Sequence, residues 1–148
     1  MTGQADRLRR RAAREGFDAS STPEVGGLLA ALAATKPGGT FLELGTGAGL
    51  GTASLLNGMS ETARLVTIEL SEALSRAAQE EITDPRVEWV IADGGQWPAA
   101  QQPRQRRYDL VFAVIEHADP VGQPPPHFRV SSGRTAPGHR SRCRMRGN

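Results

Sequence analysis

The sequence predicts an α/β fold in which a mostly parallel sheet is flanked by helices. Four short apolar runs are typical of buried strands: residues 41–44, 64–70, 87–91 and 108–113. The first run ends in alternating glycines, and small residues typical of a helix follow at 53–57. Because one helix-length segment separates the first two runs, they form a strand–helix–strand unit with parallel strands.

Length and composition restrict the class of protein. A chain of 148 residues is at most one domain and can bury a normal core. No run of about 18 apolar residues occurs, so no membrane span is expected. The polar, basic residues 1–14 lack the apolar segment of a secretion signal, which favours a cytoplasmic location. The single cysteine, Cys143, excludes an internal disulfide framework or a cysteine metal cluster.

Charge divides the chain into three parts. Residues 1–19 form a basic amino-terminal segment, and residues 20–119 hold most of the acidic side chains and the apolar runs. Residues 120–148 contain six arginines, five prolines, four glycines and no acid, a composition typical of irregular chain. We interpret this tail as a native disordered segment or, preferentially, as the product of a shifted reading frame, which would truncate the domain.

Two helices are expected before the first strand. Residues 4–16 predict a basic surface helix with Leu8, Ala12 and Ala13 on one side, which we favour over an anion-binding arm. A second helix begins at Thr22, a capping residue that Pro23 and Glu24 follow in favourable positions. Its apolar stripe has helical spacing and consists of Val25, Leu28, Leu29 and Leu32.

The glycine-rich turn after the first strand indicates a ligand site. Its glycines, Gly45, Gly47, Gly49 and Gly51, alternate strictly, so neither G-x-G-x-x-G nor the phosphate loop G-x-x-x-x-G-K-[ST] fits. Glycine allows a sharp turn and lets a ligand approach the backbone closely. Glu43 adds a carboxylate that would repel a pyrophosphate but suits a ligand with an ammonium group.

The wording of residues 42–49 resembles the first motif of class I S-adenosylmethionine-dependent methyltransferases, acidic-x-Gly-x-Gly-x-Gly. Leu-Glu-Leu-Gly-Thr-Gly is similar to the small-molecule O-methyltransferase branch in particular, and the resemblance covers about residues 20–113. It implies a Rossmann-like sheet, incomplete at its carboxyl-terminal side, and S-adenosylmethionine as cofactor. The implied cofactor-binding residues are Glu43, Gly45, Gly47, Gly49, Glu69 and Asp93. A glycine-rich turn of another α/β protein is the alternative.

Two acids end the second and third strands. Glu69 lies 20 positions after Gly49, one helical crossover away, where a carboxylate can accept two hydrogen bonds from a ribose diol. Ser71 then caps a helix over 72–82 whose small inward residues are Ala73, Ala77 and Ala78. Asp93 ends the third strand, where the resembling family meets the adenine amino group; an Asp-Gly turn is nearly as good an interpretation.

The resemblance stops after the fourth strand. Asp109 at its beginning is expected to be structural, and Val114 stands where the O-methyltransferases usually carry an acid. No metal ligand set can be matched, and Glu116, His117 and Asp119 are better explained as a polar loop. The catalytic base therefore stays unknown.

These observations together predict an S-adenosylmethionine-dependent O-methyltransferase that acts on a small molecule. The alternatives are a cofactor-binding remnant without catalysis and another nucleotide-binding α/β domain, such as an NAD-dependent enzyme. No feature indicates a nucleic-acid or membrane partner. Without a fifth strand, residues 108–113 would form an apolar edge, so we expect self-association and no methyl transfer by this chain.

Overall fold

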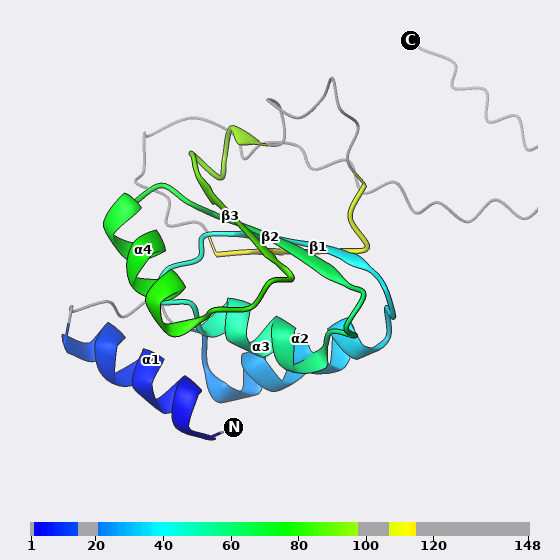
Figure 1. The fold of residues 1–148 in the computed structure, drawn as a ribbon, viewed down its shortest axis with the longest axis horizontal. Coiled ribbons are helices and arrows are strands. Elements are labelled where there is room, and N and C mark those ends of the chain that lie inside the picture. Colours follow the sequence, from blue (N-terminus) through cyan, green and yellow to red (C-terminus); the bar gives the residue numbers. More distant parts are fainter. Residues whose placement is uncertain (1, 15–20, 98–106, 115–148) are drawn as a thin grey trace, which may run out of the picture.

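The computed structural model describes residues 2–14, 21–97 and 107–114 (Figure 1). Its elements, in chain order, are α1 (Thr2–Arg14), α2 (Pro23–Ala34), β1 (Thr40–Leu44), α3 (Leu50–Gly58), β2 (Arg64–Glu69), α4 (Glu72–Glu81), β3 (Val87–Ile91) and β4 (Leu110–Ala113). The four strands pair in parallel in the order β3-β2-β1-β4. The predicted α/β, Rossmann-like fold with a parallel sheet is confirmed.

Strand β1 lies between β2 and β4 and organises the core on both faces of the sheet. Phe41 is opposite Leu65 on β2 and Leu110 on β4, and these side chains pack against α2 and α3. Residues one position further along, such as Leu42 and Val66, lie on the other face. Figure 1 shows α2 and α3 together along one side of the sheet.

Helix α2 turns a different face to the core than its apolar stripe predicts. Thr22 caps it as expected, because its hydroxyl accepts the N–H of Val25 at 3.4 Å. Of the stripe, however, only Leu29 is buried, while Leu28 is 59% exposed. The face that meets α3 carries small residues instead, since a Cβ added at Gly26 would lie 2.7 Å from the hydroxyl of Ser54.

Helix α1 packs by two of its three predicted apolar residues. Leu8 and Ala12 are buried, whereas Ala13 is exposed. Leu8 contributes to a cluster with Leu50 and Ile82, from α3 and the end of α4. The helix therefore joins the core rather than standing apart from it.

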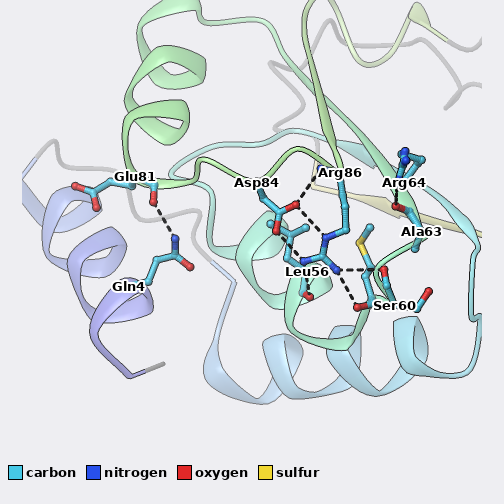
Figure 2. Close-up of polar contacts among 9 residues, drawn as sticks. Gln4, Leu56, Ser60, Ala63, Arg64, Glu81, Asp84 and Arg86 are labelled. Atoms are coloured by element: carbon cyan, nitrogen blue, oxygen red, sulfur yellow. Dashed lines mark hydrogen bonds and ion pairs between the residues drawn. The ribbon is translucent and has the colours of Figure 1, made fainter.

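The basic side chains of α1 bind acids of α4. The Nε of Arg7 lies 3.0 Å from a carboxylate oxygen of Glu81, and Arg11 lies 3.0 Å from Glu80. Gln4 donates its side-chain N–H to the carbonyl of Glu81 at 2.8 Å (Figure 2). These contacts agree with the surface-helix interpretation of α1.

Helix α4 begins as predicted and buries a slightly different set of side chains. The hydroxyl of Ser71 accepts the N–H of Leu74 at 3.3 Å, which confirms the cap. Ala77 and Ala78 face inward, but Ala73 is exposed. The buried position on that turn is Ser75, whose oxygen accepts a hydrogen bond from Gln79.

Several predictions fall on parts of the chain that the structure does not describe. The boundary near residue 19, the irregular tail at 120–148 and the polar loop with Glu116, His117 and Asp119 all lie outside the described residues. Within the described ranges, no helix is long and apolar enough to cross a membrane.

Candidate functional site

The predicted site residues gather where the parallel strands end. The loop after β1 is tied to β2, because the N–H groups of Gly45 and Thr46 both donate to the carbonyl of Ile68, at 2.8 and 3.2 Å. Val114, directly after β4, donates its N–H to the carbonyl of Leu44 at 2.8 Å. Glu69 ends β2 beside this loop. Ligands bind at this edge of open α/β sheets.

Three loop glycines have backbone conformations that other residues rarely adopt: the φ angles of Gly45, Gly47 and Gly49 are 90°, 52° and 87°. At Gly45 the close neighbour is the protein itself, since an added Cβ would lie 2.0 Å from the carbonyl oxygen of Val114. At Gly49 it would lie 3.2 Å from the Cβ of Ala78, on α4. These two positions require glycine because neighbouring parts of the protein pack closely against them, and not only because a ligand approaches the loop.

Glu69 is bonded to the glycine loop by its carboxylate. Its Oε2 accepts the N–H of Gly47 at 2.8 Å, and its Oε1 accepts the N–H of Ser71 at 2.9 Å. Each carboxylate oxygen has two lone pairs, so each has capacity for a further donor. The side chain is only partly buried, which leaves it accessible to a ligand at the sheet edge.

Glu43 is enclosed by the fold instead of lying open at the sheet edge. Its side chain is 1% exposed, and its Oε2 accepts hydrogen bonds from the hydroxyls of Thr52 and, at 2.7 Å, Thr67. Among the residues that the structure describes, Oε1 has no hydrogen-bond partner, and it lies against Gly51, where an added Cβ would meet it. Burial raises the pKa of Glu43 to about 7; the threonine hydrogen bonds oppose this rise, and the charge of Glu69 adds to it.

Asp93 shapes the turn after β3. Its Oδ1 accepts the N–H of Gly95 at 2.8 Å, and its carbonyl accepts the N–H of Trp97 at 2.9 Å. A Cβ added at Gly94 would lie 3.5 Å from the Cβ of Leu44, so this turn reaches the end of β1. The structure thus brings Asp93 close to the loop in the fold and gives it the turn role that the sequence left open.

Sequence reasoning missed the hydroxyls around Glu43. Thr67 lies on β2 and Thr52 on α3, and the hydroxyl of Thr46 in the loop lies 2.6 Å from that of Thr67. Thr46 and Thr52 stand within and next to the glycine motif, which was their only signal, whereas Thr67 on β2 had none. Asp109 is structural as predicted, because its Oδ2 accepts the N–H of Thr40 at 2.8 Å.

The part of the chain that the structure describes holds no group of three or more histidine, cysteine or acidic side chains able to bind a metal ion. Val114, where the resembling family usually carries an acid, lies against Gly45 and supplies only backbone groups there. The described site therefore consists of a glycine loop and strand-end carboxylates.

A parallel sheet with such a loop at its carboxyl edge defines an α/β domain that binds a nucleotide-like ligand. The chain belongs to the methyltransferase domain family, whose model matches residues 41–125. It is 35% identical over 106 residues to a protein of Mycobacterium ulcerans named as a candidate O-methyltransferase; the match covers 70% of this chain and 46% of that protein. A similarly named protein of Mycolicibacterium smegmatis is 35% identical over 120 residues, with 76% and 56% covered.

Solved structures show the same fold. The O-methyltransferase from Bacillus cereus in complex with SAH matches with a TM-score of 0.63 and 26% identity over 76% of this chain and 54% of that chain. The O-methyltransferase TomG from Streptomyces achromogenes in complex with SAM matches with a TM-score of 0.66 and 22% identity, with 74% and 52% covered. The chain thus spans about half the length of these relatives.

Proposed function

We propose that this chain binds S-adenosylmethionine and is part of an O-methyltransferase of small hydroxylated molecules. The observation that carries the proposal is Glu69, which ends β2 and accepts the N–H of Gly47 within a family-matched glycine loop. The names of the relatives and the SAM and SAH complexes of similar folds support it. A cytoplasmic location is part of the same proposal.

The loop glycines, Glu69 and Asp93 each have a proposed part in holding the cofactor. The free lone pairs of Glu69 would accept the ribose hydroxyls, while Gly47 would let the cofactor approach the loop. Asp93 would lie near the adenine, since its turn reaches the end of β1. Gly45 and Gly49 would act indirectly, because they allow the loop to pack against Val114 and Ala78.

The cofactor, when bound, would supply an electrophilic methyl group for transfer to an acceptor oxygen. The described residues would bind and orient it, which is how proximity lowers the barrier of such a transfer. They offer no acid at Val114 and no metal-binding group, so we assign no catalytic base to them.

Replacement of Glu69 by alanine is expected to weaken S-adenosylmethionine binding by about 1–3 kcal/mol, the scale of lost hydrogen bonds to a charged group. Isothermal titration calorimetry of the full chain measures this change. Glu72→Ala is the matched control, because it removes a nearby exposed carboxylate that pairs with Arg76 and does not contact the loop. Equal affinities of the Glu69 variant and the wild type would exclude Glu69 from the site. Binding of NAD instead of S-adenosylmethionine would support the other nucleotide-binding alternative.

We also propose that the chain self-associates through the outer edge of β4. Among the described strands, β4 pairs only with β1, and Val111 is 44% exposed. An unpaired apolar edge is a template for a strand of another chain. In sedimentation velocity we expect the wild type to associate and Val111→Lys to stay monomeric. Leu28→Lys, on the exposed face of α2, is the control and should associate like the wild type. If Leu28→Lys were monomeric while Val111→Lys associated, the contact between chains would lie on α2 and not on β4.

A further inference from the structure

The buried carboxylate of Glu43 is connected to the ligand loop by a chain of hydroxyl groups. We propose that Glu43 is a positioning residue, which holds the loop for the cofactor through Thr67 and Thr46, and that adding a proton to it loosens this hold. The inference rests on the proposed function and concerns the regulation of that same site by pH.

The direction of each hydrogen bond follows from the carboxylate. An ionised carboxylate can only accept, so Thr67 donates its hydrogen to Oε2 at 2.7 Å. Thr67 then has no hydrogen left for Thr46, and Thr46 must be the donor in their 2.6 Å contact. Thr46 lies directly before Gly47, whose N–H is bonded to Glu69. Ionised Glu43 therefore orders the loop through Thr46, which is adjacent in sequence to Gly47, the residue that binds the proposed ribose ligand Glu69.

The same carboxylate also fixes the start of helix α3. The hydroxyl of Thr52 donates to Oε2, and Gly51 leaves room for Oε1, which an added Cβ would displace. Strand β1, strand β2, the loop and α3 thus meet at one carboxyl group. A change in the hydrogen bonds of this carboxyl group therefore shifts the positions of all four, because the closely packed interior has little free space.

The surroundings of Glu43 place its pKa close to neutral pH, so that both its protonated and its ionised form are populated there. Burial raises its pKa to about 7, and the negative charge of another acid, Glu69, adds to this rise. The groups that face it from the neighbouring elements are Thr52 and Gly51 of α3, Thr67 of β2 and Phe112 of β4, none of which carries charge. The part of the chain that the structure describes therefore gives this carboxylate no cationic partner.

The neutral form of Glu43 is a poorer acceptor than the carboxylate. A proton on Oε2 would compete with the two threonine donors. A proton on Oε1 would find no hydrogen-bond acceptor among the described residues, since Oε1 lies against Gly51 without a partner there. Either position weakens the hydroxyl chain that ends at Thr46. A buried carboxylate is costly to the fold, and an uncharged residue of similar shape would stabilise it more, so a role in the site explains the charge at this position.

Calorimetric titration of S-adenosylmethionine from pH 6 to pH 8.5 tests the proposal. For the wild type we expect affinity to rise about fivefold over this range, as follows from a one-unit lower pKa of Glu43 in the bound state. Glu43→Gln should bind weakly at every pH, like the wild type at pH 6, while its melting temperature at pH 8 is not reduced. A Glu43→Gln variant with the affinity and pH profile of the wild type would overturn the proposal.

Thr46→Val separates positioning from a direct effect of charge. It leaves Glu43 in place but cuts the chain between Thr67 and the loop. We expect weak binding without the wild-type pH profile. A Thr46→Val variant that keeps the full pH profile would overturn the hydroxyl chain as the link.

Amide chemical shifts of the ligand-free protein give a second readout, independent of cofactor. The N–H signals of Thr46 and Gly47 should titrate near pH 7 in the wild type and not in Glu43→Gln. If these signals titrate but the protein does not bind S-adenosylmethionine, the coupling between Glu43 and the loop stands and the proposed function is refuted. Signals that do not titrate would overturn the coupling itself, whatever the cofactor.

Discussion

Gly58→Val is expected to destabilise the fold by more than about 3 kcal/mol, a large part of the 5–15 kcal/mol that holds a typical domain together. Gly58 ends α3, and an added Cβ would lie 1.9 Å from the carbonyl oxygen of Ala30 and 2.6 Å from its carbonyl carbon. These are backbone atoms of α2 and cannot rotate away. The helices would have to separate, exposing core residues such as Leu29 and Leu55.

Chemical denaturation followed by circular dichroism measures this loss. Gly27→Val is the matched control, because Gly27 is exposed on α2 and a Cβ there would meet nothing within 4 Å. We expect its stability to be unchanged or slightly higher, since valine restricts the unfolded chain more than glycine does. Equal stabilities of the two variants would show that α2 and α3 do not cross at Gly58.

The same crossing explains why the burial of α2 could not be predicted from its sequence. Periodicity identifies which residues share a helix face, but the partner decides which face is buried. Helix α3 approaches through Gly58 and Ser54, and so closely that only small residues of α2, Gly26 and Ala30, fit between the two backbones. The larger Leu28 is left outside.

Local signals, in contrast, predicted the elements and their ends well. The apolar runs became four strands, and the capping residues Thr22 and Ser71 begin their helices as expected. Glu69 also ends its strand beside the glycine loop, because one helical crossover brings it there. These features depend on neighbouring residues or on chain geometry alone, which a sequence shows directly.

The contacts inside the site depend on the tertiary fold, and there the sequence was less informative. Alternating glycines all resembled ligand contacts, yet Gly45 makes room for the end of β4 and Gly51 for the Glu43 carboxylate. Thr67 lies 24 positions after Glu43 and reaches it only through strand pairing. The spacing of the motif could not distinguish space for a ligand from space for the protein.

Arg86 lies directly before β3, at the amino-terminal ends of the strands and away from the candidate site, and its guanidinium group forms several hydrogen bonds there (Figure 2). Its Nε and Nη2 donate to the two carboxylate oxygens of Asp84 at 2.9 and 2.7 Å. Its Nη1 donates to the carbonyls of Met59 and Ser60 at 2.9 and 3.2 Å, and its Nη2 contacts that of Leu56 at 3.4 Å. These carbonyls at the end of α3 have few helical donors, and the helix dipole makes that end attractive to a cation.

Burial and charge make this connection stronger than an ordinary surface ion pair. The Arg86 side chain is 19% exposed, so solvent screens its contacts only in part. Its hydrogen bond lowers the pKa of Asp84, and this contribution to stability is therefore present above the usual pKa of an aspartate and lost as the pH falls below it. At neutral pH the full set of contacts stabilises the fold.

Arg86→Ala is expected to lower the free energy of unfolding by about 2–4 kcal/mol at pH 7. It removes the charged hydrogen bonds to the α3 carbonyls and to Asp84, which keeps the backbone N–H of residue 86 as a donor. Arg86→Lys should recover only part of this loss, since a lysine keeps the charge but not the planar fork. Urea denaturation measures both variants. Arg64→Ala is the control: Arg64 is exposed, and its side chain donates to the adjacent carbonyls of Thr62 and Ala63, so its loss should stay below about 1 kcal/mol. An Arg86→Ala variant as stable as this control would mean that α3 and β3 are held together by apolar packing alone.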